Sequence, residues 1–278
     1  MGEIINVIDL AKSIKGQIAE FVSQRANNGE IIPKIASIVV GEDGGSIFYI
    51  NSQEKVANSL GILFEKILLK ESTTEENLIN EIISLNNNEK IHGIILQLPL
   101  PKHIDEKKVI SYISPDKDID CLTYINQGKL YAGHKKFIPC TPNSVVTILD
   151  SLNINLQGKE VVVVGRSNIV GKPVAALMLE RNCTVTVCHS KTKDLQSVCQ
   201  RADILILAIG IPNYIDSSYV KEEAIVIDVG TSSLNGKITG DVLIDDVIGK
   251  VSYMTKVPGG VGALTTTLLM KNVCEALK

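Results

Sequence analysis

The chain has 278 residues, enough for one large domain or two medium ones, and its 45% hydrophobic and 21% charged residues are typical of a soluble globular protein. The net charge of −3 comes without blocks of like charge, which argues against nucleic acid or an anionic membrane as a partner. No apolar run approaches the roughly 18 residues that span a bilayer. The N-terminus carries acidic Glu3 rather than the basic start of a signal peptide, so we expect a cytoplasmic protein.

Cysteine and histidine spacing predicts no metal site. The six cysteines form no CxxC pair, and the four histidines do not cluster, so neither set has the spacing of familiar zinc sites. We expect the cysteines to be reduced and buried as small hydrophobic residues.

The first half of the chain alternates between helical and strand patterns. The predicted elements are a helix over 7–22, a strand over 34–41, a helix over 46–62, a strand over 62–69, a helix over 74–88 and a strand over 92–101. This alternation is typical of an α/β fold with a parallel sheet.

A second unit begins near residue 138. Val161 to Val164 are four consecutive β-branched residues, as expected of a strand buried on both faces, and Pro173 suits the first turn of the helix that follows. Further elements are predicted as strands over 184–190, 203–210 and 224–230 and a helix over 193–202. The pattern indicates a doubly wound, Rossmann-type nucleotide-binding unit. The last helix, over 264–277, could close this unit or pack on the first one.

The predicted helix over 46–62 carries a polar residue in its apolar seam. At about 100° per residue, Tyr49 and Gln53 fall within one narrow stripe of the helix. Lys55 is six residues after Tyr49 and therefore points about 120° away. We expect Tyr49 and Gln53 to face one site together and Lys55 to face elsewhere.

The segment 165–171, "GRSNIVG", is a candidate phosphate loop. A glycine after a central strand permits a tight turn, and a second one at the helix start permits a phosphate to approach the backbone amides. The spacing is not GxGxxG, so an ordinary βα loop is the alternative. Other glycines that follow strand-like runs are Gly210, Gly230, Gly259, Gly260 and Gly262. Together they favour a cofactor crevice at the carboxyl ends of the strands.

The tip of the second strand in this unit bears on which dinucleotide is bound. NAD-specific sites usually place an acid about 20 residues after the glycine loop, but here the tip carries His189, Ser190 and Lys191, and the first acid is Asp194. Arg166 lies in the glycine loop itself. A guanidinium, a hydroxyl and an ammonium would suit a 2′-phosphate, which favours NADP, although a solvated basic turn is the alternative.

Two polar features of the first half remain. The segment 115–122 contains Asp116, Asp118 and Asp120, which lack the glycine and distal glutamate of an EF-hand; they are either a solvated turn or supply a carboxylate for the N–C–N edge of a heterocycle. Gln97 ends a buried-type strand, where its amide needs a ligand or neighbouring backbone as partner.

Taken together, these segments resemble the methylenetetrahydrofolate dehydrogenase/methenyltetrahydrofolate cyclohydrolase family over essentially the whole chain. The stretches that carry the resemblance are "SIFYINSQEKVANSLGI", "HGIILQLPLPKHI", "PDKDIDCLT", "FIPCTP", "VVVVGRSNIVGKPVAALML", "TVTVCHSKTKDL", "GDV" and "VPGGVGALT". The resemblance implies a folate-binding catalytic domain over 1–138 plus 264–278, a Rossmann-type NADP domain over 139–263, a folate cleft between them, and a homodimer. The implied reaction is hydride transfer from 5,10-methylenetetrahydrofolate to the nicotinamide, giving 5,10-methenyltetrahydrofolate.

The resemblance also assigns residue roles. It implies that Tyr49 stacks on the folate, Gln97 is the cleft glutamine and Asp120 binds the pterin; with Gln53 these are the expected catalytic residues. The expected cofactor-binding residues are Thr141, Gly165, Arg166, Ser167, Ile169, Ser190, Gly210 and Thr231. Pro258, Gly259 and Gly260 match the loop near nicotinamide and folate.

One departure from the family pattern bears on the chemistry. Most members carry a lysine four residues after the tyrosine, and that position here is Gln53, whereas Lys55 matches a second, commonly basic position. The family lysine is tied to the cyclohydrolase step, in which water adds to the methenyl carbon and the ring opens to 10-formyltetrahydrofolate. A lysine can exchange a proton with water, but a glutamine can only orient it.

Smaller departures lie in the nicotinamide loop and its surroundings. The family usually has proline at the positions of Lys256 and Ala263, a bulkier apolar residue at Thr231 and glycine at Cys121. Three readings follow: an NADP-dependent dehydrogenase with weak or absent cyclohydrolase activity, a fully bifunctional enzyme in which Lys55 or another group substitutes, and a folate- or nucleotide-binding protein without turnover.

Overall fold

The computed structural model describes residues 2–234 and 236–278, which divide into two compact units. Unit 1 is formed by the described residues of 1–12 and 139–265, and unit 2 by 13–138 and 266–278. The units differ from the expected domain boundaries at the N-terminus, where residues up to Lys12 belong to unit 1. Among the described residues, no helix is long and apolar enough to cross a membrane.

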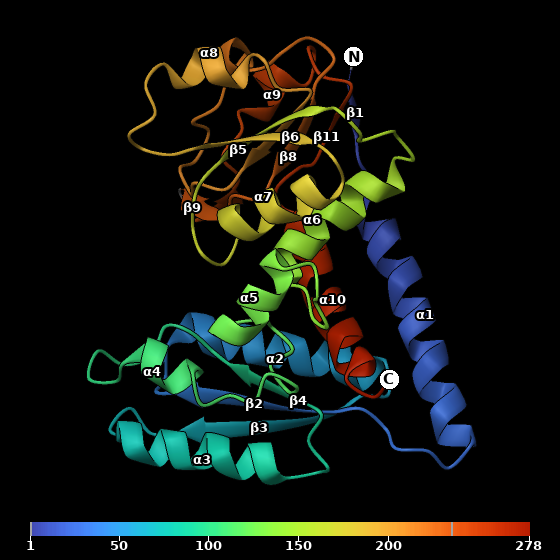
Figure 1. Cartoon of the computed structure of the whole chain (residues 1–278), viewed down its shortest axis with the longest axis vertical. Coiled ribbons are helices and arrows are strands. Elements are labelled where there is room, and N and C mark those ends of the chain that lie inside the picture. The colour runs from blue at the N-terminus through green and yellow to red at the C-terminus, as the bar shows by residue number, and fades with distance from the viewer. Residues whose placement is uncertain (1, 235) are drawn as a thin grey trace. The chain divides into compact units, whose positions relative to one another are not determined.

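Unit 1 contains a parallel sheet flanked by helices. Its strands are β1 (Glu3–Ile4), β5 (Glu160–Val164), β6 (Thr184–Cys188), β7 (Ile204–Leu207), β8 (Ile225–Asp228) and β11 (Tyr253–Met254). Its helices are α6 (Cys140–Ser151), α7 (Gly171–Glu180), α8 (Leu195–Cys199), α9 (Ile244–Val247) and the 3₁₀ turn η1 (Ser217–Tyr219). Figure 1 shows α6 and α7 on one face of this sheet and α8 and α9 on the other. This doubly wound arrangement confirms the predicted α/β class.

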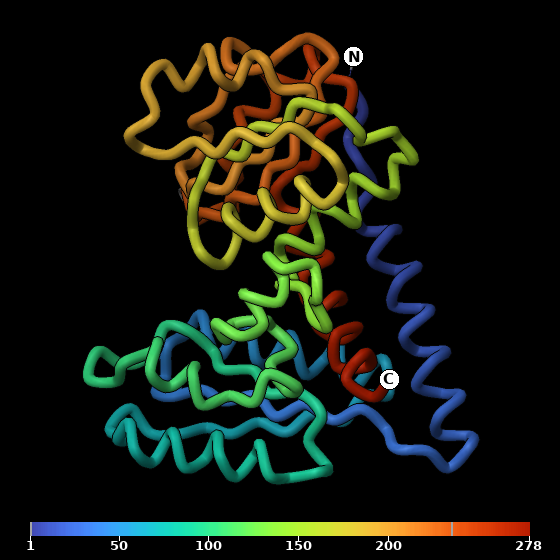
Figure 2. The backbone as a smooth tube through the Cα atoms, in the orientation of Figure 1, coloured from blue at the N-terminus to red at the C-terminus, as the bar shows by residue number. Residues whose placement is uncertain are grey.

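The order of the strands places the central crossover of unit 1. Within the described residues the sheet runs β1-β11-β8-β7-β5-β6, and all its neighbouring strands are parallel. The chain leaves β5 for β6 on one side and then returns to β7 on the other, a path that can be followed in Figure 2. The switch point, where ligands of such sheets bind, therefore lies between β5 and β7.

Alternation along the central strands explains the core of unit 1. Val162 and Val164 share one hydrophobic cluster with Leu205 and Leu207, and Val163 on the opposite side of β5 is also fully buried. A strand covered on both faces needs apolar residues at every position, which accounts for the run of valines. Between β8 and β11 in the sequence, the strands β9 (Ser232–Leu234) and β10 (Lys237–Thr239) form a separate antiparallel pair.

Unit 2 is built on a smaller parallel sheet in the order β3-β2-β4. Its elements are β2 (Lys34–Val40), α2 (Gly44–Ser59), β3 (Leu63–Leu69), α3 (Glu75–Asn87), β4 (Gly93–Leu96), α4 (Glu106–Ile110) and α5 (Tyr124–Tyr131). Figure 1 shows α2 and α3 on opposite faces of the sheet. Ala36 and Ile38 on β2 join the cluster that contains α3, so the intervening Ser37 faces the α2 side.

Two helices contribute residues to both units. They are α1 (Val7–Asn27) and α10 (Val261–Glu275), the first and last helices of the chain. The part of α10 from Thr266 onward belongs to unit 2, which answers the open question of where the last helix packs. In unit 1, β1 pairs with β11 through Glu3 opposite Tyr253.

Candidate active site

Helix α2 begins with a side-chain cap formed by Asp43. The Asp43 carboxylate accepts hydrogen bonds from the Ser46 backbone nitrogen at 2.8 Å and from the Ser46 hydroxyl at 3.0 Å. These bonds, the backbone one foremost, lower the pKa of Asp43 below its usual value. An ionised residue at this position also complements the helix dipole. The cap therefore fixes the residue at which α2 begins.

Gln53 and Gln97 form a direct pair. The Gln97 amide nitrogen donates to the Gln53 Oε1 at 2.7 Å and to the Ser37 hydroxyl at 3.0 Å. Strand register explains the meeting, because Ser37 lies opposite Ile95 on β4, and Gln97, two residues further, shares that face. Gln53 is 9% exposed, so the pair is largely shielded from water. The partners that Gln97 was expected to need are therefore two side chains rather than neighbouring backbone.

The remaining residues of the α2 face differ sharply in exposure. Tyr49 is 56% exposed, and its ring contacts the edge of Phe48 with centroids 6.0 Å apart. A broad, accessible phenol of this kind is suited to stacking on a planar ligand. Lys55 is exposed as well, whereas Gln53 is buried. The ammonium of Lys55 therefore does not replace Gln53 on the face that meets Gln97.

The three aspartates of segment 115–122 have three different environments. Asp116 is exposed and lies 3.7 Å from the Lys136 ammonium. Asp118 is 1% exposed, and Asp120 is only partly buried. The three equally spaced aspartates are therefore one surface charge, one core carboxylate and one carboxylate at an intermediate depth.

The buried Asp118 organises the turn that carries Asp120. Its carboxylate accepts from the backbone nitrogens of Leu122 and Thr123 at 2.8 and 2.9 Å, from the Thr123 hydroxyl at 2.7 Å and from the Asn126 amide at 2.9 Å. Burial raises the pKa of Asp118, and the hydrogen bonds from Thr123 oppose that rise. The two bonds from backbone nitrogens close the turn that contains Asp120.

Further contacts hold the same turn. Asn272 on α10 donates through its amide to the Ile119 carbonyl at 2.8 Å and to the Ile138 carbonyl at 3.0 Å. Cys121, at the usual glycine position of the family, adopts a φ of 59°, a left-handed conformation that costs a residue with a side chain about 1 kcal/mol. Burial raises the pKa of this thiol to about 12, so it stays protonated and unreactive.

The glycine loop of unit 1 is shaped by close backbone approach. A Cβ at Gly165 would clash with the Ala208 carbonyl oxygen, and one at Gly171 would clash with the Gly165 carbonyl. Gly165 also has a φ of 130°, which glycine adopts freely. The Ser167 hydroxyl accepts from the Gly171 nitrogen at 3.3 Å at the start of α7. Gly165 therefore lets the chain after β5 approach the chain after β7 at the switch point, and Gly171 lets the start of α7 approach the glycine loop.

The end of β6 lies beside the glycine loop, because β6 pairs with β5. β5 pairs with β6 so that Val164 lies opposite Cys188, which places Arg166 and Ser190 just beyond two adjacent strand ends. Both side chains are exposed. The exposed guanidinium and hydroxyl fit an added phosphate, whereas no acid stands at the tip to hold a ribose 2′-hydroxyl.

The other expected cofactor and substrate residues named here all belong to unit 1. Ile169 is 58% exposed, Thr231 is exposed, and Thr141 in the first turn of α6 is partly buried. Pro258 follows a cis peptide bond after Val257, and Gly259 has a φ of 94°. A Cβ at Gly260 would clash with the Lys256 carbonyl, so this loop also depends on glycine.

Two buried carboxylates at this edge were not singled out by their spacing. Asp228 and Asp241 are 1% and 0% exposed, and both accept hydrogen bonds from backbone nitrogens of the strand-end loops. Burial raises the pKa of Asp228 to about 6, and the nearby Asp241 charge adds to the rise. The sequence signal for Asp241 is "GDV", one of the stretches that carry the family resemblance.

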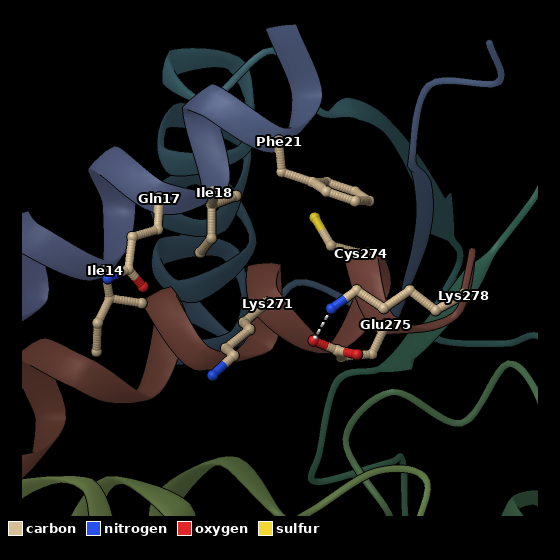
Figure 3. Close-up of a pocket in the computed structure, with 8 residues that line it drawn as sticks. All are labelled: Ile14, Gln17, Ile18, Phe21, Lys271, Cys274, Glu275 and Lys278. Carbon is tan, nitrogen blue, oxygen red and sulfur yellow. Dashed lines mark hydrogen bonds and ion pairs between the residues drawn. The ribbon is translucent and has the colours of Figure 1, made fainter. Parts of the chain in front are cut away.

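A separate pocket in unit 2 lacks the chemistry of a reactive site. It has a volume of about 160 Å³ and lies between α1 and α10, as Figure 3 shows. Its lining residues are Ile14, Gln17, Ile18, Phe21, Lys271, Cys274, Glu275 and Lys278. Burial raises the pKa of Cys274 to about 12, and the Lys278 ammonium pairs with Glu275 at 2.9 Å. Its thiol is inert, and its polar groups lie at the rim.

Comparison with known proteins decides the family. Residues 139–278 match the family model described as the tetrahydrofolate dehydrogenase/cyclohydrolase NAD(P)-binding domain, and residues 5–120 match the catalytic domain of the same family. The chain belongs to the tetrahydrofolate dehydrogenase/cyclohydrolase family. A relative called bifunctional protein FolD from Clostridium botulinum strain Alaska E43 is 66% identical over 100% of this chain and 99% of its own length. A relative of the same name from Clostridium perfringens strain SM101 is 59% identical over the full length of both chains.

Solved structures of the family agree over nearly the whole chain. The bifunctional FolD enzyme from Campylobacter jejuni superimposes with a TM-score of 0.97 at 39% identity, covering 99% of this chain and 98% of the other. The Trypanosoma brucei enzyme, solved with NADP and an inhibitor, gives a TM-score of 0.93 at 35% identity, covering 99% and 97%. The family assigns this chain NADP as cofactor, a folate as substrate and dehydrogenase activity.

Proposed function

We propose that the chain oxidises 5,10-methylenetetrahydrofolate with NADP and performs the cyclohydrolase step weakly or not at all. The observation that carries this proposal is the hydrogen bond from the Gln97 amide to Gln53 at 2.7 Å. A neutral amide thus occupies the position of the family lysine. Neither amide of the pair can take up or release a proton near pH 7, so the pair offers no group for general acid–base work on water.

Hydride transfer asks less of this pair. When bound, the nicotinamide of NADP supplies the hydride acceptor, and the protein contributes mainly orientation. In the proposed arrangement Tyr49 stacks on the folate and Asp120 holds the pterin edge. Because Gln97 donates to both Gln53 and Ser37 through one nitrogen, its amide oxygen is the atom that can accept a hydrogen bond from substrate. None of these roles requires a lysine.

The cofactor site is proposed at the carboxyl edge of the unit 1 sheet. Arg166 and Ser190 would hold the 2′-phosphate, which the exposed guanidinium at the end of β5 and the hydroxyl at the end of β6 support. Gly165 and Ser167 would border the phosphates, with Ile169, Gly210, Thr231 and Thr141 completing the expected contacts. Pro258, Gly259 and Gly260 would lie against nicotinamide and folate. A homodimer and a cytoplasmic location stay predictions from the family resemblance and the sequence.

A fully bifunctional enzyme is the second candidate. It is favoured by the printed name of relatives up to 66% identical to this chain, which are called bifunctional. In that case a group other than Gln53 activates water, and Lys55 is the nearest lysine in sequence. The exposure of Lys55 and the burial of Gln53 on α2 weigh against this candidate. A binding protein without turnover is disfavoured by the family membership.

Two assays on the wild-type chain test the proposal. Dehydrogenase activity is followed as NADPH formation with methylenetetrahydrofolate, and cyclohydrolase activity as loss of methenyltetrahydrofolate absorbance above its spontaneous hydrolysis. We expect the first activity and little of the second. Brisk cyclohydrolase turnover would overturn the proposal, and its loss in Lys55→Gln would then identify Lys55 as the substitute.

A further inference from the structure

We propose that Asp241 is a positioning residue for the dinucleotide site, because its buried carboxylate fixes the backbone that follows β7. Its Oδ2 accepts from the Ile209 and Gly210 nitrogens at 2.8 and 3.2 Å, and its Oδ1 accepts from the Ile211 nitrogen at 2.8 Å. Three consecutive N–H groups thus converge on one side chain that is 0% exposed. Charge-assisted bonds of this kind are about twice as strong as neutral ones.

The location of these three residues connects them to the cofactor. They lie one residue beyond the end of β7, at the switch point between β5 and β7, where ligands of doubly wound sheets bind. Ala208, the residue between them and β7, packs closely on Gly165, because a Cβ added to Gly165 would clash with the Ala208 carbonyl. Residues 209–211 therefore border the glycine loop. The inference rests on the proposed placement of NADP at this edge.

The N–H groups of residues 209–211 point to Asp241, and this determines which backbone groups remain for a ligand. In a trans peptide the carbonyl points opposite to the N–H of the same unit. Since the Gly210 N–H points to Asp241, the Ile209 carbonyl points away from it, toward the outside of the loop. The Gly210 carbonyl is held by the Ser232 hydroxyl at 3.0 Å. This segment presents an acceptor, which suits hydroxyl or carboxamide donors of the dinucleotide rather than its phosphates.

A second carboxylate holds Asp241 itself. Asp228 accepts from the backbone nitrogens of Asp241 at 3.1 Å, Val242 at 3.0 Å and Gly230 at 2.9 Å, and its own nitrogen donates to the Thr255 hydroxyl at 2.8 Å. The two carboxylates therefore join the loops that follow β7, β8 and β10, and the Asp228 backbone adds the bond to Thr255 after β11. Such a frame lets Asp241 act on the cofactor without touching it.

The test compares NADP binding in three variants of the full chain. In Asp241→Asn the amide has only one acceptor oxygen, so at least one of the loop N–H groups faces an NH₂ donor. We expect the Kd and KM for NADP to rise about tenfold, with kcat at saturating NADP changed less than about threefold, since one strong buried bond is lost. Asp216→Asn is the matched control, because its carboxylate caps η1 in the same unit through Ser218 at 2.9 Å. Its Kd should stay within about twofold of wild type.

An unchanged Kd in folded Asp241→Asn, or an equal rise in Asp216→Asn, would overturn the inference. Where Asp241→Asn does not fold, Ser232→Ala decides, because it removes only the hydroxyl that holds the Gly210 carbonyl. A rise of about threefold in the Kd supports the inference, and no rise contradicts it. Arg166→Ala, measured alongside, separates the two proposals. If Arg166→Ala weakens NADP binding and Asp241→Asn does not, only the positioning role fails; if neither does, the placement of the cofactor fails as well.

Discussion

The proposed cofactor edge of unit 1 is made mostly of backbone, whereas the proposed folate site of unit 2 is made of side chains. At the unit 1 edge, glycines let strand ends approach, and buried carboxylates such as Asp241 hold the loops from behind. In unit 2, Gln53 and Gln97 meet through their own amides, and Tyr49 presents its ring to solvent. A site made of backbone depends on the buried residues that hold its loops in place. A side-chain site can change its chemistry through one substitution.

The largest expected effect is on the side-chain site. Gln53→Lys should raise cyclohydrolase activity by about 100-fold, because a positioned general acid or base contributes at least that much, while dehydrogenase activity changes little. In this variant the Gln97 side-chain amide must rotate by about 180°, so that its oxygen rather than its nitrogen faces the new ammonium. Both activities are measured with the assays described above. The matched control is Lys55→Gln, which should alter neither rate; no gain in Gln53→Lys would show that another group is also missing.

The next effect concerns the support of Asp120. Asp118→Asn replaces a carboxylate that accepts four hydrogen bonds and leaves at least one buried donor facing an amide NH₂. We expect the free energy of unfolding to fall by about 2 kcal/mol, with a raised KM for folate and an unchanged Kd for NADP. Denaturant unfolding and steady-state kinetics measure the two effects. Asp116→Asn, at an exposed position, should change stability by less than about 0.5 kcal/mol, and equal losses in both variants would contradict the assignment.

At the cofactor edge of unit 1, the exposed guanidinium of Arg166 should decide which dinucleotide is preferred. Arg166→Ala should raise the KM for NADP about tenfold and leave the KM for NAD nearly unchanged, since only NADP has a 2′-phosphate for the guanidinium to bind. The ratio of the two KM values is the measurement. Lys172→Ala is a suitable control, because its ammonium is occupied by the Asn168 side chain at 2.7 Å. An equal change for both cofactors would refute the role of Arg166.

The smallest expected effect is the pH dependence of stability that the buried carboxylate of Asp228 causes. Burial raises the pKa of Asp228 to about 6 in the folded state, against an ordinary value of 3.8. As the pH falls from 7 to 5, the folded chain therefore binds a proton before the unfolded chain does. This stabilises the wild type by about 1 kcal/mol relative to Asp228→Asn, which has no such group. Thermal or denaturant unfolding of both proteins across this range measures the difference, and a difference independent of pH would contradict the raised pKa.

The parts of the fold that were predictable have strong local periods. The helix predicted over 7–22 is part of α1, and the strand predicted over 34–41 is β2, because an amphipathic helix and a doubly buried strand are visible in their own residues. β1 and β11 are two residues each and exist through pairing with each other and with β8, so no local pattern reveals them. Their pairing is also what brings the N-terminal residues into unit 1.

In the candidate site, too, relations within one helix were predictable, whereas contacts between distant segments were not. Helical geometry indicated that Gln53 and Lys55 face different ways, and the burial of one and exposure of the other agree with this. It could not identify Ser37 and Gln97 as partners, since their meeting depends on sheet register over 60 residues. Nor could it separate Asp118 from Asp120, because residues two apart in an irregular turn have no fixed relation to the core. The role of Asp241 depends on three loops that are distant in sequence.

The Gln53–Gln97 pair also has a consequence in mutational terms. A glutamine codon and a lysine codon differ by a single base, so this buried amide pair lies one point mutation from an amide–ammonium pair. The cap at Asp43 and the register between β2 and β4 that frame the pair do not involve residue 53, so they would persist through the change. Under the proposed function, one base change at residue 53 separates an enzyme with one reaction from an enzyme with two.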